Sequence, residues 1–284
     1  MKLGAGTVTW AFNGESLETA LQEIASTGIR YVDIIGMLHG DPENLTQDIK
    51  TACKKIIQEK GLKVSSILAV KPGINIATNN KALQNQSKQY IQQIIDLCHF
   101  FDASEICLMA GHHEFESDAQ TNWNRAVDFS HWICEQCLDT GLYVTYELEW
   151  RTCGIVQSIR EMFQMIQDVN CPNLYANIDV GHAGLARDSL TDMETIGERT
   201  IHLHMNDNDT VIHVNALPGE GAVPIRDYVQ SLIKGGMLTH AKAMDYTVIA
   251  GIEVEDVTDS GQPSVSLIKQ SRDWILENIS SIQL

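Results

Sequence analysis

The stretch TIHLHMND, residues 200–207, decides the fold because its side chains alternate between apolar and polar along the whole run. The polar row is His202, His204 and Asn206, and the apolar row is Ile201, Leu203 and Met205. Successive side chains of a β-strand point to opposite faces, so each row occupies one face. The stretch is therefore predicted to be a strand with one face under helices and the other face lining a polar site.

Three further runs of the second half alternate in the same way. They are LYVTYELEW at 142–150, NLYANIDVGH at 173–182 and YTVIAGIEVEDV at 246–257. A solvated antiparallel sheet would produce the same pattern. However, residues 154–168 and 226–237, which lie between the runs, have the spacing and the length of helices. Strand and helix therefore alternate, which favours parallel strands whose polar row lines a closed barrel.

The first half continues the alternation of strand and helix. Strands are predicted at 3–10, 31–35, 64–70 and 105–110, and helices at 16–27, 42–61, 81–101 and 119–140, with a last helix at 265–279. No Pro/Ser-rich linker or low-complexity segment marks a domain boundary. The chain of 284 residues is also close to the roughly 250 that an α/β barrel needs. The sequence thus predicts one domain, residues 1–284, with a (β/α)8 TIM barrel fold.

Composition limits the classes of partner. The formal charge of −17 disfavours nucleic acid and anionic membranes. No signal peptide or membrane-spanning run is recognised, and the seven cysteines suit a reducing compartment, so a cytoplasmic protein is expected. The lone CxxC of Cys134 and Cys137 falls in a helical pattern and is assigned to packing rather than to zinc. The sequence leaves a homo-oligomer open.

Four side chains are candidates for a metal site. Glu147, Asp179, His204 and Glu253 all come late in their strands and all belong to the polar rows. The C-terminal ends of the strands carry the active site in such barrels. Three oxygens and one nitrogen suit Mn²⁺, Mg²⁺, Co²⁺ or a catalytic Zn²⁺. A purely structural polar layer is the alternative, but unpaired buried carboxylates are costly and a cation would compensate them.

Several motifs resemble the sugar phosphate isomerase/epimerase superfamily. They are Asp179-x-x-His182 in NIDVGH, His204-x-Asn-Asp207 in HLHMND, Glu147 in TYELEW and Glu253 in GIEVED. This is the xylose isomerase-like TIM barrel group, which also contains endonuclease IV, ketose 3-epimerases, hydroxypyruvate isomerases and inosose dehydratases. The resemblance implies that Glu147, Asp179, His204 and Glu253 bind one divalent metal, with Mn²⁺ as first choice. It also implies that His182 lies beside the metal and contacts the substrate.

The chain departs from two members of that group. Ketose 3-epimerases usually carry an Arg soon after the histidine of the seventh strand, and residues 206–211 (NDNDTV) contain none. Endonuclease IV has further ligands on its third strand and an Asp-x-His pair after the seventh. Here the third strand has no His, and Val211 stands two residues before His213. A trinuclear zinc cluster is therefore not expected.

Five more residues are candidates for substrate contacts or for support of the site: Trp10, Asp33, His112, Glu149 and His213. Trp10 is read either as an apolar wall for a sugar or as packing at the barrel mouth. Glu149 is an alternative ligand to Glu147 or a salt-bridge partner. His112 either meets substrate hydroxyls or is a surface histidine, and His213 belongs to a loop over the site. Asp33 is expected to be an acceptor beside the ligands.

The reaction that such a site suits is proton transfer at carbon. A divalent ion that holds a carbonyl and an adjacent hydroxyl acidifies the C–H between them and stabilises an enediolate, and Glu147 and Glu253 would remove and return the proton. The first hypothesis is a metal-dependent isomerase or epimerase of a small-molecule sugar or sugar derivative. The alternatives are a lyase or dehydratase, with His182 or His213 as the acid, an endonuclease IV-type phosphodiesterase, and a barrel that only binds sugars.

Overall fold

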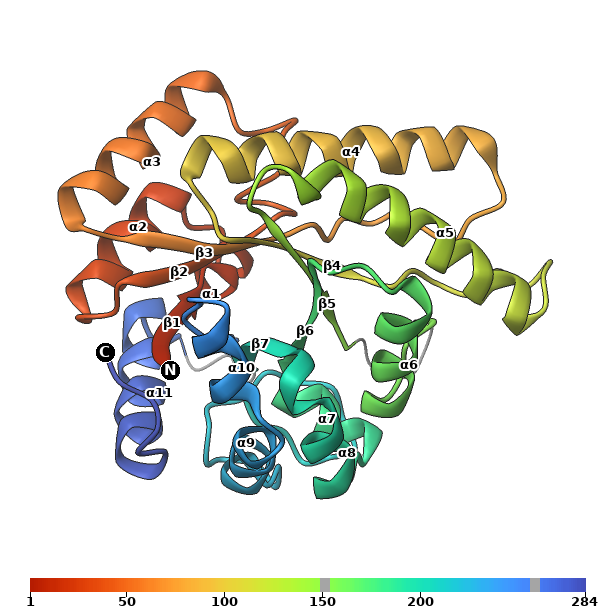
Figure 1. Ribbon diagram of the computed structural model, residues 1–284. Helices are drawn as coiled ribbons and strands as arrows, with labels where there is room; N and C mark the ends of the chain where they lie inside the picture. Colours follow the sequence, from red (N-terminus) through yellow and green to blue (C-terminus); the bar gives the residue numbers. More distant parts are fainter. Residues whose placement is uncertain (149–153, 256–260) are drawn as a thin grey trace.

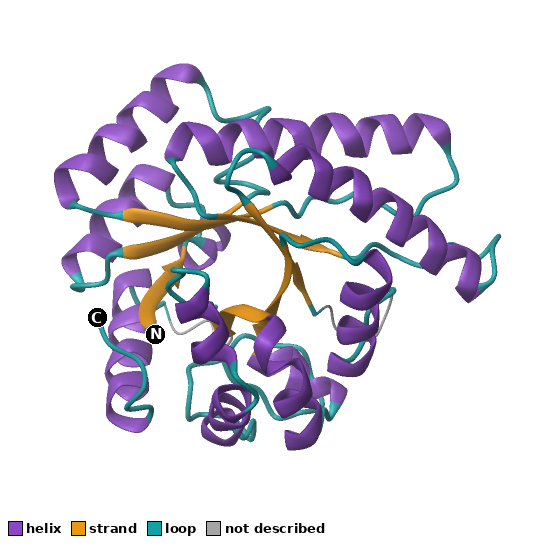
Figure 2. Ribbon diagram, in the orientation of Figure 1, coloured by secondary structure: helices purple, strands orange, loops and turns teal. Residues whose placement is uncertain are grey.

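Eight parallel strands close into one barrel in the order in which they occur along the chain (Figures 1 and 2). The computed structural model describes residues 1–148, 154–255 and 261–284. The strands are β1 (Lys2–Gly6), β2 (Tyr31–Ile35), β3 (Lys63–Leu68), β4 (Glu105–Met109), β5 (Tyr143–Glu147), β6 (Leu174–Asp179), β7 (Thr200–Met205) and β8 (Ile249–Ile252). β8 pairs in parallel with β1 and closes the sheet. The predicted (β/α)8 barrel is confirmed.

Helices surround the barrel on its outer side (Figure 2). They are α1 (Val8–Phe12), α2 (Leu17–Ser26), α3 (Gln47–Lys60), α4 (Lys81–Phe101), α5 (Ala119–Leu138), α6 (Ile159–Val169), α7 (Val180–Ala186), α8 (Leu190–Ile196), α9 (Ile225–Lys234), α10 (Met237–Ala243) and α11 (Ser264–Asn278), with the 3-10 turn η1 (Gly197–Arg199). Among the described residues, none of these helices has the length and apolar character required to cross a bilayer.

The predicted strand at 3–10 is wrong in its second half. β1 ends at Gly6, and the chain turns at Thr7, whose N–H donates to the carbonyl of Asp33 (2.8 Å) while its hydroxyl accepts from the N–H of Ile35 (3.1 Å). α1 follows and places Trp10 in the core, where it has no exposed surface and its indole N–H donates to Glu23 (2.7 Å). Trp10 therefore packs the interior and does not form a wall that a sugar could reach.

Other boundaries differ because side-chain caps begin the helices. Ser158 caps α6, so that helix starts at 159 and not at 154, and Thr46 caps α3, so that helix starts at 47 and not at 42. The run at 173–182 ends as a strand at Asp179, which itself caps α7. A capping oxygen satisfies N–H groups that the first helical turn leaves without partners. The short helices α1, α7, α8 and α10 were not predicted.

The alternation along β7 separates two kinds of interior. Ile201, Leu203 and Met205 have no exposed surface and pack in the hydrophobic core between the barrel and its helices. His202 and His204 point to the other side, into the barrel, and are also buried, at 0% and 1% exposure. The barrel therefore has an apolar outer layer, which stabilises the fold, and a polar inner layer, which must satisfy its own hydrogen bonds.

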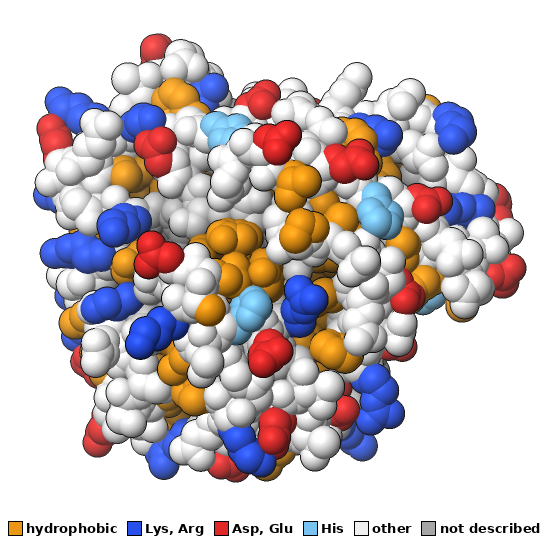
Figure 3. Space-filling view, in the orientation of Figure 1, with side chains coloured by type: hydrophobic (Ala, Val, Ile, Leu, Met, Phe, Trp, Pro, Cys, Tyr) orange, Lys and Arg blue, Asp and Glu red, His pale blue; other side chains and the backbone are white. Residues whose placement is uncertain are grey.

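The two ends of the barrel differ in character. In Figure 1 the N-terminus and α10, which precede β1 and β8, lie at the front, so the view is onto the end where the strands begin. Apolar side chains gather near the centre of this end in Figure 3. Among the residues at the starts of β5, β6 and β8, Tyr143 contacts Tyr175 and Tyr246 edge to face. The candidate site lies at the opposite end, where β5 to β8 finish.

We expect Leu203→Ala to lower the free energy of unfolding by about 2–5 kcal/mol, because it opens a cavity in the outer layer. The change leaves the polar face of β7 untouched. Urea denaturation of both proteins measures the difference. Leu190→Ala is the control, since Leu190 is 46% exposed and its loss should change stability by no more than about 0.5 kcal/mol. Equal losses in the two variants would contradict the assignment of faces.

Candidate metal centre

Four side chains from neighbouring strands converge at the C-terminal end of the barrel. Glu147 ends β5, Asp179 ends β6, His204 is the fifth residue of β7 and Glu253 follows β8. Each offers one ligand atom, and these atoms lie within 4.8 Å of one another. The strand register produces this convergence, because Asp179 pairs with His204 across β6 and β7. The four residues that the sequence singles out are therefore brought together.

His204 is at the centre of the group. Its Nδ1 lies 2.6 Å from Oε1 of Glu147 and 2.8 Å from Oε2 of Glu253. The side-chain amide nitrogen of Asn177 lies 3.2 Å from both ring nitrogens of His204. One ring nitrogen thus faces two carboxylates at once, which is the arrangement expected around a point where a cation binds.

Burial and charge shift the pKa values of these groups in opposite directions. Burial raises the pKa of Glu147, and the nearby Glu253 adds to this, so that the pKa stays above its ordinary value although His204 lowers it. Burial also raises the pKa of Glu253, but His204 outweighs this and lowers it overall. Burial lowers the pKa of His204, while Glu253 and Glu147 raise it well above its usual range. The carboxylates thus compete for one positive partner.

The donor set fits a divalent cation. Three carboxylates carry three negative charges in a region where Glu147 is 4% exposed, Asp179 0% and Glu253 9%. A single imidazolium leaves two of these charges without compensation, which is costly in a buried site. Carboxylate oxygens with one imidazole nitrogen are ligands for Mn²⁺, Mg²⁺, Co²⁺ or catalytic Zn²⁺. These four residues are the ones that would hold the ion.

Asp179 is oriented by both of its carboxylate oxygens. Oδ1 accepts from the backbone N–H of His182 (2.7 Å), which caps α7, and Oδ2 accepts from the amide of Asn206 (2.6 Å). Asn206 fits because Gly181 has no side chain, since a Cβ there would lie 1.8 Å from Oδ1 of Asn206. The hydrogen bonds that fix Asp179 are the kind that support metal ligands in proteins.

His182 lies on the first turn of α7, beside the group of four. Its Nδ1 lies 2.6 Å from the carbonyl oxygen of Leu148, which only accepts, so Nδ1 carries a hydrogen. Its Nε2 lies 2.8 Å from Nε2 of His213, and the two rings are 4.8 Å apart. The loop after β7 therefore folds over the site through His213, and the structure brings these two predicted residues together.

The remaining predicted residues lie further out or outside the described chain. His112 follows β4 at the barrel mouth, where its backbone N–H and carbonyl bond the side chain of Asn75. Its Nδ1 is buried without a partner in the described part of the chain. Glu149 lies outside the described residues. Glu255, which lies two residues after Glu253 and is not one of the predicted site residues, is half-buried. Burial raises its pKa, and the charge of Glu253 adds to this.

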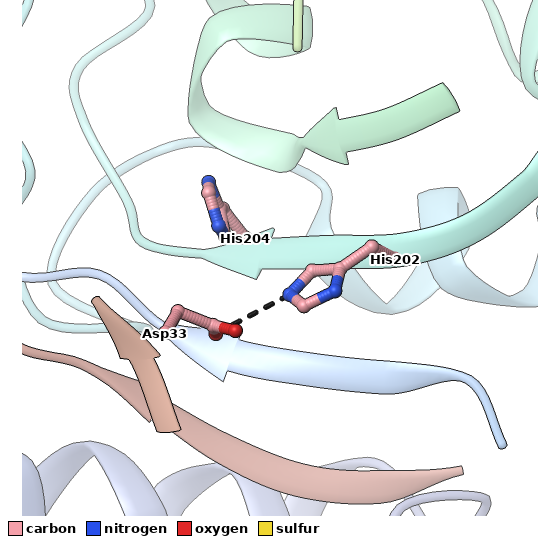
Figure 4. A group of neighbouring side chains, drawn as sticks. All are labelled: Asp33, His202 and His204. Carbon is pink, nitrogen blue, oxygen red and sulfur yellow. Dashed lines mark hydrogen bonds and ion pairs between the residues drawn. The ribbon is translucent and has the colours of Figure 1, made fainter. Parts of the chain in front are cut away.

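A second set of charged groups lies deeper in the barrel, and the sequence indicated only part of it. His202 lies 3.3 Å from Asp33 (Figure 4) and 3.0 Å from Glu105. Each of the three residues is at most 1% exposed. Burial would lower the pKa of His202, but the two carboxylates outweigh this and raise it to about 10. The alternation placed His202 inside the barrel, but only the closed barrel shows that Glu105 of β4 reaches it.

The closed parallel barrel, with its polar groups at the C-terminal ends of the strands, defines an α/β barrel whose functional site is built from strand ends. The chain belongs to the xylose isomerase-like TIM barrel family, whose model matches residues 21–278. The resemblance seen in the motifs is thus confirmed.

Several known proteins are similar to the chain. It is 21% identical over 228 residues to a fructoselysine 3-epimerase of Shigella flexneri, which covers 78% of this chain and 82% of that protein. A solved structure described as the IolI protein with a bound zinc atom is 14% identical, with a TM-score of 0.85 and coverage of 99% of both chains. An L-ribulose 3-epimerase structure is 15% identical, with a TM-score of 0.79 and coverage of 99% of this chain and 95% of that one.

We expect Asp179→Asn to lower the affinity for Mn²⁺ or Zn²⁺ at least 10-fold and His204→Ala to lower it further. Asparagine still caps α7, so the first variant removes a charged ligand while the helix is kept. Metal content after dialysis and titration calorimetry measure the effect. Thr195→Ala on α8, an exposed change away from the site, is the control. Full metal occupancy in both variants would show that the four residues are only a structural polar layer.

Proposed function

We propose that the protein is a divalent-metal-dependent isomerase or epimerase that acts on a sugar or sugar derivative through an enediolate. The observation that carries this proposal is the convergence of Glu147, Asp179, His204 and Glu253 at the catalytic end of the barrel, within 4.8 Å of one another. The similarity to proteins named as sugar 3-epimerases supports an enzyme of this class. The zinc atom described for the IolI structure, which has the same fold, is in keeping with a metal-dependent protein, and Mn²⁺ is our first choice from the donor set.

The ion, when bound, would polarise a carbonyl and its neighbouring hydroxyl and so acidify the C–H between them. Glu147 and Glu253 would then move the proton. They come from β5 and from the end of β8, and Nδ1 of His204 lies between them at 2.6 and 2.8 Å. Carboxylates on two sides of the reacting carbon allow one to remove the proton and the other to return it.

Burial and charge act on both glutamates in the same way. Burial raises the pKa of each carboxyl, and the nearby His204 lowers it. Each carboxylate also comes within 2.8 Å of Nδ1 of His204, from a different strand. One glutamate is therefore assigned proton removal and the other proton return, and deuterium exchange in the two variants below decides which does which.

His182 is assigned a place beside the substrate. Its Nδ1–H is held by the carbonyl of Leu148, which fixes the ring, and its Nε2 lies 2.8 Å from Nε2 of His213 on the loop after β7. An imidazole fixed in this way can exchange the contact with His213 for one with a substrate hydroxyl. His182 therefore orients the sugar, and His213 closes the loop over it.

The glutamate pair is tested by Glu147→Gln and Glu253→Gln. Each variant should lose about 10²–10⁴-fold in kcat, the usual contribution of a general acid or base. In D₂O, one of the two variants should still exchange the substrate C–H for deuterium without making product, because proton removal is intact in it. The other variant should do neither, which identifies the glutamate that removes the proton.

The readouts are NMR of the exchanged substrate and assay of a panel of ketoses. Bound metal is measured in parallel, so that loss of the ion is not mistaken for loss of a base. Solvent deuterium in an isomeric sugar supports the proposal. Loss of water or an absorbing enone would instead identify a dehydratase. Normal turnover by both variants would disprove the two-carboxylate mechanism.

His182 is tested by two replacements that mimic different ring nitrogens. Asparagine places its amide near Nδ1 and keeps the bond to Leu148, whereas glutamine places its amide near Nε2. If Nε2 contacts the substrate, we expect His182→Asn to lower kcat/KM about 10²-fold or more and His182→Gln to retain part of it. Metal affinity should stay within a few-fold of wild type. Unchanged kinetics for His182→Asn would show that His182 only packs beside the site and does not contact the substrate.

A further inference from the structure

Four side chains joined by hydrogen bonds form a chain through the barrel beneath the candidate metal centre. They are Tyr246, Glu105, His202 and Asp33. Tyr246 donates its hydroxyl to Oε1 of Glu105, and Nδ1 of His202 lies 3.0 Å from the same oxygen. Nε2 of His202 lies 3.3 Å from Oδ2 of Asp33. Glu105, His202 and Asp33 are at most 1% exposed. The chain therefore crosses the barrel interior from β4 to β7 to β2 without contact with solvent.

The geometry fixes the charge on His202. A carboxylate oxygen only accepts, so an imidazole with a carboxylate at each nitrogen donates from both and is an imidazolium. The far end of the chain is held as firmly, because the hydroxyls of Ser65 (2.7 Å) and Ser66 (2.8 Å) both donate to Oδ1 of Asp33. Both oxygens of Asp33 are thus engaged, and its carboxylate has one position.

The neighbouring strand leaves room for this carboxylate. Gly251 of β8 pairs with His204 of β7, and a Cβ on Gly251 would lie 2.1 Å from Oδ2 of Asp33 and 3.4 Å from Nε2 of His202. A side chain at residue 251 would therefore displace the Asp33 carboxylate or the whole strand. The carboxylate of Asp33 thus occupies the space that a side chain at residue 251 would fill.

Asp33 and His202 both lie close to His204, one of the four proposed ligands. Asp33, His202 and His204 each have a nitrogen or carboxylate oxygen within 4.8 Å of the others (Figure 4). The rings of His202 and His204 are 5.3 Å apart at 81°, so the edge of one faces the other. Asp33, His204 and Glu253 also line the same narrow space, next to the C-terminal ends of β1, β2 and β3. The imidazole of His204 thus lies directly beside Asp33 and His202.

We propose that Glu105, His202 and Asp33 form a positioning chain that sets the orientation of His204 as a metal ligand. The proposal rests on the metal centre described above. Groups that hold a metal-bound histidine through charge or hydrogen bonds typically change metal affinity 10–100-fold when they are removed. None of the three residues would touch the substrate, so each acts through His204 and not on the reacting atoms.

Asp33→Asn and Gly251→Ala test the chain without altering any of the four ligands. The first keeps the volume and removes the negative charge, and the second keeps the charge and pushes it away. Both should weaken Co²⁺ binding about 10–100-fold and shift the visible absorption bands of the bound Co²⁺, which report ligand geometry. Competition with a chelator gives the affinity, and circular dichroism confirms the fold.

Thr145→Val is the matched control. Thr145 lies two residues before the ligand Glu147, as His202 lies two residues before His204. In the described part of the chain, its buried hydroxyl makes no hydrogen bond to any of the four ligands. This nearly isosteric change at the same depth should leave the Co²⁺ affinity and spectrum unchanged. Ser66→Ala is a milder variant that removes one donor to Asp33, retains every charge, and should shift both readouts in the same direction by a smaller amount.

Each outcome decides between the proposals. A folded Asp33→Asn or Ser66→Ala protein with the wild-type affinity and spectrum overturns the positioning chain and leaves the metal centre standing. An equal shift in Thr145→Val also overturns it, because any change at that depth would then act alike. If wild-type protein binds no Co²⁺ or other divalent ion, the proposed metal centre and the proposed positioning chain are both wrong. A change of Co²⁺ affinity and spectrum in Asp33→Asn and Ser66→Ala, without one in Thr145→Val, supports the positioning chain.

Discussion

Crowding of three buried carboxylates around one imidazole is the interaction on which the mouth of this barrel depends. Glu147 and Glu253 both approach Nδ1 of His204, and Asp179 completes the group. Such an arrangement is unfavourable unless a positive charge compensates it, so the surrounding chain must hold the carboxylates against their repulsion. The cap of α7 and the amide of Asn206 do this for Asp179. The closed sheet does it for the others by fixing where each strand ends.

Two glycines make this crowding possible. Gly181 leaves space for the Asn206 amide, and Gly251 leaves space for the carboxylate of Asp33, and in each case a Cβ would come within about 2 Å of the polar atom. A barrel interior has little free volume, so a charged group enters only where a neighbouring position gives up its side chain. The two glycines and the polar groups that they admit are therefore one structural feature.

The sequence predicted the barrel and the four converging residues because both follow from local alternation. A polar row with a period of two needs no tertiary information, and its last members lie at the strand ends. Contacts across the barrel could not be read in that way. The bond from His202 to Glu105 joins residues 97 positions apart, and the pairing of His182 with His213 depends on how the loop after β7 folds back. Trp10 was misplaced because VTW alternates like a strand, although the turn at Thr7 begins a helix.

The polar interior of the barrel has two layers, which differ in how far their negative charges are compensated. In the lower layer, Asp33 and Glu105 flank the imidazolium of His202, and each of these carboxylates also accepts from a hydroxyl group. In the upper layer three carboxylates surround the single imidazole of His204. A layer that is internally paired resists a change of charge, whereas a layer with excess negative charge can accept a cation or a proton. The chemistry therefore belongs to the upper layer, and the lower layer provides the fixed charge against which His204 is held.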